Sequence, residues 1–288
     1  MRAGQAQGAT GTLYVVATPI GNLEDITYRA VRTLGEVDLV AAEDTRHSRK
    51  LFARFGIQTP LVSYHDHNEL QRHAELLERL LAGENIALIS DAGTPCIADP
   101  GYRLIAACHS AGVAVVPIPG PSALITALSA AGASTERFAF EGYLPQRAKA
   151  RATLLCQLLG EPRTLVFYEA PHRLAATLAD LVEILGGERQ IVVARELTKL
   201  HEEFFRGTAD EAVKRFQQEP VRGELVLIIP PGMRGPQVNA REALRQLLND
   251  GDMSRRDAVK LIAKEYGLSS SDVYRESLSL TEKEDVDE

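Results

Sequence analysis

Short apolar runs alternate with amphipathic segments along the first half of the chain, and this pattern predicts strands and helices in turn. The apolar runs are short and rich in β-branched or aliphatic residues, as buried strands are. They span residues 12–17, 39–42, 61–64, 86–89 and 113–117. Helices are expected between them, including residues 102–110 and 123–131, and Asp25 or Thr27 is a suitable cap for one that begins near residue 28. Such alternation predicts a parallel sheet with helices on both faces.

Residues 132–140 are rich in Gly, Ser and Thr, which predicts a linker between two α/β units. A second α/β pattern follows this stretch. The predicted strands are 164–168, 191–194 and 225–229, with 204–206 as a further short strand. The predicted helices are 148–159, 174–185 and 210–217. We therefore expect a flexible N-terminal extension at 1–11, a first α/β domain at 12–119 and a second at 120–232.

The tail differs in character from both α/β domains. It predicts three short helices at 240–248, 255–266 and 271–278, which form a helical, helix-turn-helix-like domain at 233–280 before a disordered acidic end at 281–288. The second helix carries the basic residues Arg255, Arg256, Lys260 and Lys264. Two interpretations remain open: these helices contact nucleic acid, or they are an appendage that covers the second domain or a subunit contact.

Composition narrows the classes of protein that this chain can be. Of its 288 residues, 45% are hydrophobic and 25% are charged, which is ordinary for a globular enzyme. Apolar runs are too short to cross a membrane, the N-terminus lacks a secretory core, and three scattered cysteines fit a reducing compartment. We therefore expect a cytoplasmic protein without a membrane partner. The net charge is -7, so a nucleic-acid partner requires a local concentration of basic groups.

The segment Ser90 to Gly101, SDAGTPCIADPG, is the strongest candidate for a ligand site. It follows the predicted strand 86–89, and in open α/β sheets ligands bind at the carboxyl ends of the strands. Gly93 allows a ligand to approach the backbone, while Asp91 and Asp99 accept hydrogen bonds. The alternative is a well-capped turn without a ligand.

Several common sites are absent from the sequence. The chain has no G-x-G-x-x-G after its first strand, no P-loop motif and no G-x-S-x-G elbow. His65, His67 and His73 lie close together with acidic neighbours, but no distant ligand cluster accompanies them, so no metal site is predicted. What remains is an acid-lined cleft with Gly-Pro turns, which suits a ligand with a cationic or amino-bearing end and a nucleoside.

A series of motifs gives the chain a family resemblance. In chain order they are YVVATPIGNLEDIT, EDTR, YHDHNE, SDAGTPCIADPG, PIPGPSA, FEGYLP, FYEAPHR, RELTKLHEEFFRGT and RGELVL. In this order they resemble the RsmI family, ribosomal RNA small-subunit methyltransferases that act on a cytidine 2′-oxygen, within the tetrapyrrole-methylase class. The resemblance covers residues 12–232. It implies two α/β domains of the tetrapyrrole-methylase type with a cleft between them, S-adenosylmethionine as cofactor, a homodimer, and 16S ribosomal RNA in the small subunit as partner.

The resemblance also implies which residues contact S-adenosylmethionine. They are Thr18, Pro19, Asp91, Ala92, Gly93, Thr94, Ile97, Ser122, Ala123, Tyr168, Glu169, Glu196 and Leu197. For Ser122 the alternative role is a helix cap.

Methyl transfer to a ribose 2′-OH needs a base, because this hydroxyl is a poor nucleophile at neutral pH. The 2′-OH also distinguishes RNA from DNA, so no DNA partner is expected. Candidates for the base are Asp44, His65, Glu69, Glu196 and His201, and of these Asp44, His65 and Glu196 are the predicted bases. We expect residues 43–46 and His65 to line the acceptor side of the cleft. Arg46, Arg173, Arg195 and Lys199 are candidates for RNA contact. These residues also have structural alternatives. The EDTR motif could be a helix cap with an ion pair, and the RELTK motif could be a strand end with a surface ion pair.

Two other functions are compatible with the sequence. One is a methylase of the same class with a small-molecule acceptor such as a tetrapyrrole. The other is a non-catalytic RNA-binding module with a degenerate pocket. The intact acidic and Gly-Pro loops argue against the second.

Overall fold

The computed structural model describes residues 10–217, 221–231, 244–245, 247–248, 253–265 and 269–279. The chain divides into two compact units, Met1–Pro231 and Gly232–Glu288. The expected acidic end, and all but the last two residues of the expected N-terminal extension, lie outside the described residues.

The first sheet is five-stranded and parallel, with the strand order β3-β2-β4-β1-β5. Its strands are β1 (Thr12–Val16), β2 (Leu39–Ala42), β3 (Leu61–Ser63), β4 (Ile86–Ile89) and β5 (Ala114–Ile118). All residues of β2 and β4 are buried, as expected for central strands covered on both faces. β5 lies at the edge and contains Pro117, which an edge strand tolerates because its missing N–H breaks no inner ladder. The predicted parallel sheet is confirmed.

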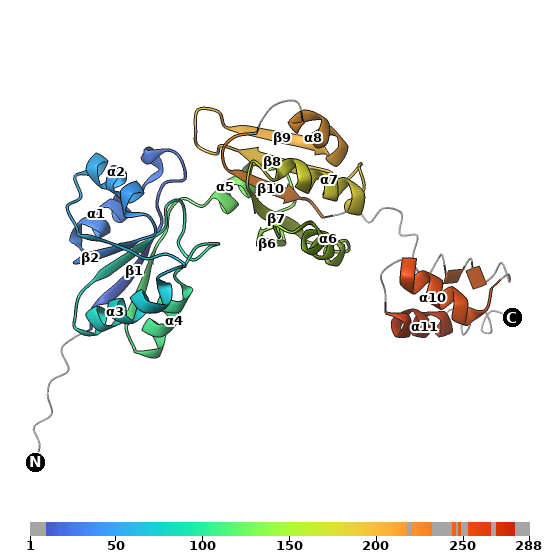
Figure 1. The fold of residues 1–288 in the computed structure, drawn as a ribbon, viewed down its shortest axis with the longest axis horizontal. Coiled ribbons are helices and arrows are strands. Elements are labelled where there is room, and N and C mark those ends of the chain that lie inside the picture. The colour runs from blue at the N-terminus through green and yellow to red at the C-terminus, as the bar shows by residue number, and fades with distance from the viewer. Residues whose placement is uncertain are drawn as a thin grey trace, which may run out of the picture. The chain divides into compact units, whose positions relative to one another are not determined.

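Helices cover both faces of this sheet (Figure 1). On one face lie α1 (Tyr28–Glu36) and α2 (Thr45–Phe55), which bury Leu34, Leu51 and Phe52 against the sheet. On the other lie α3 (Glu69–Leu81) and α4 (Tyr102–Ser110) with their own buried cluster. A short 3-10 helix, η1 (Leu23–Asp25), precedes α1. Of the two expected caps for α1, Thr27 is the one used, because its Oγ1 accepts the Ala30 N–H at 3.1 Å.

The second sheet has the strand order β6-β7-β10-β8-β9 and is mixed. Its strands are β6 (Phe138–Tyr143), β7 (Thr164–Glu169), β8 (Gln190–Arg195), β9 (Glu203–Thr208) and β10 (Leu225–Ile229). Only β6 and β7 are parallel; the pairs β7–β10, β10–β8 and β8–β9 are antiparallel.

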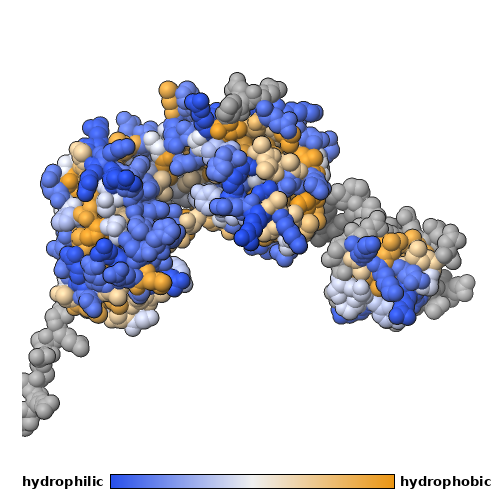
Figure 2. All heavy atoms as spheres, in the orientation of Figure 1, coloured by the Kyte–Doolittle hydropathy of each residue, from blue (hydrophilic) through white to orange (hydrophobic). Residues whose placement is uncertain are grey.

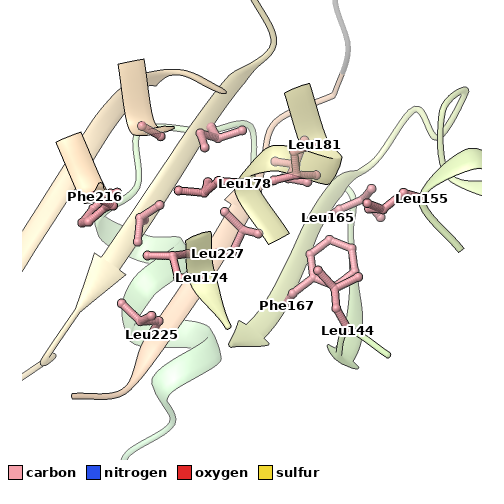
Figure 3. Packing of buried hydrophobic residues seen from close by; sticks show 14 of the residues in the cluster. Leu144, Leu155, Leu165, Phe167, Leu174, Leu178, Leu181, Phe216, Leu225 and Leu227 are labelled. Carbon is pink, nitrogen blue, oxygen red and sulfur yellow. The ribbon is translucent and has the colours of Figure 1, made fainter. Parts of the chain in front are cut away.

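Each face of the second sheet has its own core. One packs against α6 (Ala148–Gln157), α7 (Leu174–Leu185) and α8 (Ala209–Phe216), and Figure 3 shows Leu174 and Leu178 of α7 beside Leu227 of β10. The other face packs against α5 (Ala123–Ala130), whose Leu124 and Leu128 join a buried cluster with residues of β7, β8 and β10. The loop that closes β5 therefore leads directly into a helix of the second sheet.

Strand β6 is the element that sequence patterning missed, since its first residues were interpreted as part of a link. β6 lies at an edge, its pairing with β7 shifts register between Phe140 and Tyr143, and Gly142 has φ +66°. A bulged strand of this kind interrupts the alternation from which strands are recognised.

The second unit contains α10 (Arg255–Glu265) and α11 (Ser270–Ser279). They close a small core that includes Leu244, Val259, Ile262 and Val273. Most of the expected helix at 240–248 lies outside the described residues. Across the part of the chain that is described, no helix has the length and apolar character to cross a membrane.

Candidate functional site

The loops that follow β1 and β4 are bound to each other at the carboxyl ends of these adjacent strands. The Thr18 N–H donates to the Gly93 carbonyl at 2.9 Å, and the Gly93 N–H donates to the Thr18 carbonyl at 3.0 Å. The Thr18 hydroxyl donates to the Ser90 carbonyl at 3.1 Å. From β1 the chain crosses β4 to reach β2, and from β4 it crosses β1 to reach β5, so a crevice opens between the two strands.

The loop after β4 has an unusual backbone. Gly93, Cys96, Ala98 and Gly101 have φ values of +86°, +68°, +65° and +138°. Positive φ is uncommon for residues with a Cβ and costs roughly 1–3 kcal/mol at each, and such strain is concentrated at functional sites.

A buried carboxylate holds the end of this loop. Glu69, at the start of α3, accepts the Tyr64 hydroxyl at 3.1 Å and the Gly101 N–H at 3.2 Å, and its other oxygen lies 3.2 Å from the Arg103 guanidinium. Glu69 is only 9% exposed, so these partners compensate for its desolvation. We conclude that Glu69, which the YHDHNE motif contributes, is an anchor for the strained loop.

A cavity of about 310 Å³ lies between this loop and the second sheet. Most of the residues predicted to contact the cofactor line it: Asp91, Ala92, Gly93, Thr94, Ile97, Ser122, Ala123, Tyr168, Glu169 and Leu197. The lining also includes residues outside that predicted set: Ile20, Glu43, Ala98, Asp99, Tyr143, Ala170, Pro171, Glu224, Leu225 and Val226. All of these additional residues lie within the quoted motifs, so the sequence did contain a signal for them. The structure thus brings loops separated by two hundred residues around one hollow.

Carboxylates dominate the first-domain wall of the cavity. The Asp91 N–H donates to Glu43 Oε2 at 3.3 Å, and Asp91 Oδ1 accepts the Asp44 N–H at 2.9 Å, which ties the loops after β2 and β4 together. Burial raises the pKa of Glu43, with the charges of Asp91 and Asp66 adding to the rise. Burial, and then the charge of Glu43, raises the pKa of Asp99 to about 6. The cavity therefore holds acidic groups that titrate closer to neutrality than ordinary carboxylates do.

The opposite wall is aromatic. The Tyr168 ring packs edge-on against Phe140 and Tyr143, with centroids 4.8 and 5.7 Å apart. The Tyr168 hydroxyl oxygen accepts the Leu124 N–H of α5 at 3.2 Å, which fixes the ring. At the start of the same helix, the Ser122 side chain makes no capping hydrogen bond. Ser122 therefore does not use its side chain as the cap considered above, and it lines the cavity.

Two of the predicted bases have structural partners. Asp44 caps α2 by accepting the Arg46 N–H at 2.8 Å, and it also pairs with the Arg46 guanidinium at 2.9 Å. The hydrogen bonds from Arg46 lower the pKa of Asp44 to about 2. For Glu196, burial acts to raise the pKa, but the hydrogen bond and charge of Lys199 outweigh it and leave the pKa below its usual range. Both groups are weak proton acceptors at neutral pH.

The third predicted base, His65, lies close to the cavity wall without lining the cavity. Its backbone N–H donates to Asn68 Oδ1 at 2.9 Å, and its ring Nε2 lies 3.3 Å from Asn68 Nδ2. Its Nδ1 is buried and has no hydrogen-bond partner among the described residues. The charge of His65 acts on Glu43, where it opposes the rise in pKa caused by burial.

The turn that links β8 to β9 carries an ion-pair cluster at the edge of the site. Lys199 Nζ lies 2.8 Å from Glu196 Oε1 and 3.2 Å from Glu224 Oε2. Glu196 and Thr198 have φ values of +52° and +66°. A Cβ on Gly21, in the loop after β1, would lie 2.6 Å from the Lys199 side chain, so the two loops are in close contact.

Three further predicted residues have internal partners. The Glu169 carboxylate accepts the Thr177 hydroxyl at 2.6 Å and pairs with Arg173 at 3.2 Å. Arg173 also donates to the Leu144 carbonyl and is 14% exposed. Arg195 pairs with Glu203 at 2.7 Å. This geometry favours structural roles for Arg173 and Arg195 over contact with RNA.

Thr18 and Pro19 lie on the other side of the bridge to Gly93, in an adjoining hollow of about 490 Å³. The two hollows share Ile20, Asp91, Ala92 and Glu224 as a common wall. Glu196 lines neither hollow. In the second unit, the side chains of Arg256, Lys260 and Lys264 are exposed. No group of three or more His, Cys, Asp or Glu side chains within the described ranges is arranged to hold a metal ion.

Comparison with known proteins places this site in a class. Residues 12–213 match the family of tetrapyrrole (corrin/porphyrin) methylases. Solved structures with the same fold include diphthine synthase (TM-score 0.62, 14% identity, covering 76% of this chain and 90% of that one). A cobalt precorrin-4 methyltransferase also shares it (TM-score 0.59, 16% identity, covering 76% and 94%). The chain is therefore a methylase of the tetrapyrrole-methylase class, and the predicted fold class is confirmed.

Full-length relatives narrow this class to a family. The chain is 52% identical over 275 residues to a ribosomal RNA small subunit methyltransferase I of Synechocystis sp., covering 94% of this chain and 98% of that protein. It is 46% identical over 276 residues to the protein of the same name from Escherichia coli O157:H7, covering 95% and 96%. The chain belongs to the ribosomal RNA small subunit methyltransferase I family, as the motifs predicted. Its methyl donor is S-adenosylmethionine.

The cavity residues fit this donor. The donor carries a sulfonium, an amino group, a carboxylate, a ribose and an adenine, and the volume of about 310 Å³ is within the usual range for small-molecule sites. Glu43, Asp91 and Asp99 line the cavity, and their carboxylates would offer negative charge to the cationic groups. Tyr168 and the apolar side chain of Leu197 also line the cavity and would offer a surface to the adenine ring.

Proposed function

We propose that this protein transfers the methyl group of S-adenosylmethionine to the 2′-oxygen of a cytidine in 16S ribosomal RNA of the small subunit. The observation that carries the proposal is the acid-lined and aromatic cavity at the carboxyl ends of β1 and β4. It occurs in a chain about half identical to ribosomal RNA small subunit methyltransferases I along nearly its whole length. The choice of a cytidine 2′-oxygen rests on the family resemblance of the motifs.

S-Adenosylmethionine supplies an activated methyl group, so the protein has to align two substrates and accept a proton. The Gly93 backbone and the Asp91 carboxylate form the floor that positions the donor, and Tyr168 faces it from the second sheet. The bridge between Thr18 and Gly93 keeps this floor in place.

Among the acidic groups of the cavity, Asp99 is best suited to accept the proton of the 2′-OH. It lines the cavity, and its pKa of about 6 makes it a better base at neutral pH than Asp44, whose pKa is about 2. Glu43 supplies the neighbouring charge that supports this pKa. His65 acts through Glu43, because its charge acts on that carboxylate.

Transfer of a labelled methyl group tests this function. Small ribosomal subunits from a strain without the homologous methyltransferase are incubated with tritiated donor and the protein, and the RNA is digested to nucleosides. We expect the label in 2′-O-methylcytidine. Label found only in an added tetrapyrrole would support the small-molecule alternative, and donor binding without transfer to either acceptor would support a non-catalytic module.

For the C-terminal unit we propose contact with the RNA through the exposed face of α10. Arg256, Lys260 and Lys264 are spaced four residues apart and therefore share this face. Changing all three to glutamate is expected to weaken subunit binding and leave donor affinity unchanged. Filter binding and calorimetry measure the two quantities, and equal subunit affinity in the variant would reject a role of this face in RNA binding.

The family resemblance also leads us to propose a homodimer in the cytoplasm. Light scattering of the purified protein tests the dimer, and fractionation of cells tests the compartment.

A further inference from the structure

Helix α2 carries a row of basic side chains on one exposed face. Arg46, Lys50 and Arg54 are spaced four residues apart, so they lie in line along the helix, and His47 lies beside them. All four are exposed, while Leu51 and Phe52 on the opposite side are buried. We call Arg46, His47, Lys50 and Arg54 the α2 basic row. In the view of Figure 2, the surface over α2 is largely hydrophilic.

This row is unfavourable for the isolated helix. Like charges four residues apart repel each other, and Arg46 stands in the first turn, where the helix dipole disfavours cations. Asp44 pairs with Arg46. Within the described residues, His47, Lys50 and Arg54 form no ion pair. An arrangement of unbalanced cations in a chain with net charge -7 indicates an anionic partner for this face.

The α2 basic row borders two hollows that connect it with the cavity of about 310 Å³ described above. His47 and Lys50 line the hollow of about 490 Å³, which shares Asp91, Ala92 and other wall residues with the cavity. Arg54 lines a wider hollow of about 920 Å³. Lys199, from the turn between β8 and β9, lines both of these hollows. A chain bound along the row would therefore lead to the wall of the methyl-transfer site.

The wider hollow also presents apolar side chains to solvent. Tyr28 at the start of α1 is 98% exposed and Leu200 in the β8–β9 turn is 92% exposed. Both line the hollow together with Arg32 and Arg54. Aromatic rings interleaved with basic groups are typical of surfaces that bind single-stranded nucleic acid, where bases stack and phosphates pair with cations.

We propose that the α2 basic row and the wider hollow bind the single-stranded RNA next to the target nucleotide. Lys50, Arg54 and His47 contact its phosphates, and Tyr28 stacks on one of its bases. This inference rests on the proposed function, since it assigns the RNA path to that same site. It adds a surface on the first domain to the RNA contacts expected in the C-terminal unit.

The test compares the full-length double variant Lys50→Ala/Arg54→Ala with a matched control, Arg147→Ala/Lys149→Ala, which removes two exposed cations at the start of α6. The probe is a fluorescent single-stranded RNA with the sequence around the target cytidine, and anisotropy is measured over a range of salt concentrations. Each lost phosphate contact should reduce the slope of log affinity against log salt by about 0.7, so we expect a reduction of about 1.4 in the double variant. The control should retain the wild-type slope.

A third variant, Tyr28→Ala, addresses stacking. We expect at least about a fivefold loss of RNA affinity with an unchanged salt slope, because a stacked base is lost and no charge is removed. Calorimetry should show unchanged S-adenosylmethionine affinity in all variants, which confirms that the cavity is intact.

Two results would overturn the inference. One is an RNA affinity and salt slope in the row variants equal to those of the control; methyl transfer could then still occur, and the proposed function would stand. The other is equal competition by polyglutamate and by the RNA, which would indicate an acidic protein partner. Conversely, the row variants could bind RNA less tightly although the wild-type protein methylates no RNA. That result would support RNA binding by the α2 basic row and reject the proposed function.

Discussion

Replacing Gly93 by valine is expected to abolish binding of S-adenosylmethionine while the protein remains folded. Gly93 has φ +86°, a conformation that a β-branched residue adopts only with strain. A Cβ at this position would lie 3.3 Å from Ile20 Cγ2, and the larger side chain would displace Ile20 or extend into the cavity that both residues line. The backbone bridge to Thr18 would also be disturbed. Titration calorimetry with the donor measures the loss.

The matched control for this substitution is Gly112→Val. Gly112 has a similar φ of +73°, but no atom lies within 4 Å of its Cβ position and it is remote from the cavity lining. Both variants should lose thermal stability because of the strained φ, and Gly93→Val should lose more because of its contact with Ile20. Only the Gly93 variant should lose donor binding. Donor affinity retained in Gly93→Val would mean that the donor does not approach this loop.

The convergence of loops on one hollow was predictable from sequence because it follows from the parallel sheet. Residues that follow the apolar runs of β1 and β4 must lie at the same edge, and this reasoning places Thr18 and Asp91 near each other without coordinates. What patterning leaves undetermined is the direction of each side chain. Asp44 and Glu43 are adjacent in the EDTR motif, yet Asp44 caps α2 and Glu43 lines the cavity.

The second sheet shows another limit of the sequence. Its strands were largely found, but their antiparallel order depends on pairings between β7, β10 and β8, which lie far apart in the chain. The same holds for Arg173: the sequence made it a candidate for RNA contact, and only the fold brings it to Glu169 and the Leu144 carbonyl. Tyr143 was missed as a lining residue because the bulge in β6 determines where its ring lies.

Replacing Asp99 by asparagine is expected to lower the single-turnover rate of methyl transfer by about 10²–10⁴-fold at neutral pH, because a general base contributes this much. In the wild-type protein the ionised carboxylate accepts the proton. With a pKa of about 6, the rate should rise with pH through that value and then level off. Rapid-quench measurements at saturating donor across this pH range provide the profile, and the asparagine variant should lack the rise.

The free energy of unfolding offers a second test, because the raised pKa of Asp99 determines the direction in which stability changes with pH. Burial raises the pKa of Asp99 above its ordinary value of 3.8, so the protonated form is favoured in the folded state. The stabilising contribution of Asp99 is complete below this ordinary value and is lost as pH rises through about 6. In the Asp99→Asn variant, the free energy of unfolding measured with urea should not show this decrease with pH. Glu136→Gln, which removes an exposed negative charge, is the control and should leave both profiles unchanged.

A parallel experiment on Glu43 separates the two carboxylates, because the charge of Glu43 contributes to the raised pKa of Asp99. If Asp99 accepts the proton, Glu43→Gln removes a negative neighbour, moves the rise in rate to lower pH and preserves most of the limiting rate. If Glu43 accepts it, Glu43→Gln removes the rise and Asp99→Asn only shifts it. The second pattern would transfer the role of base to Glu43, which His65 also influences, and would contradict our assignment of Asp99.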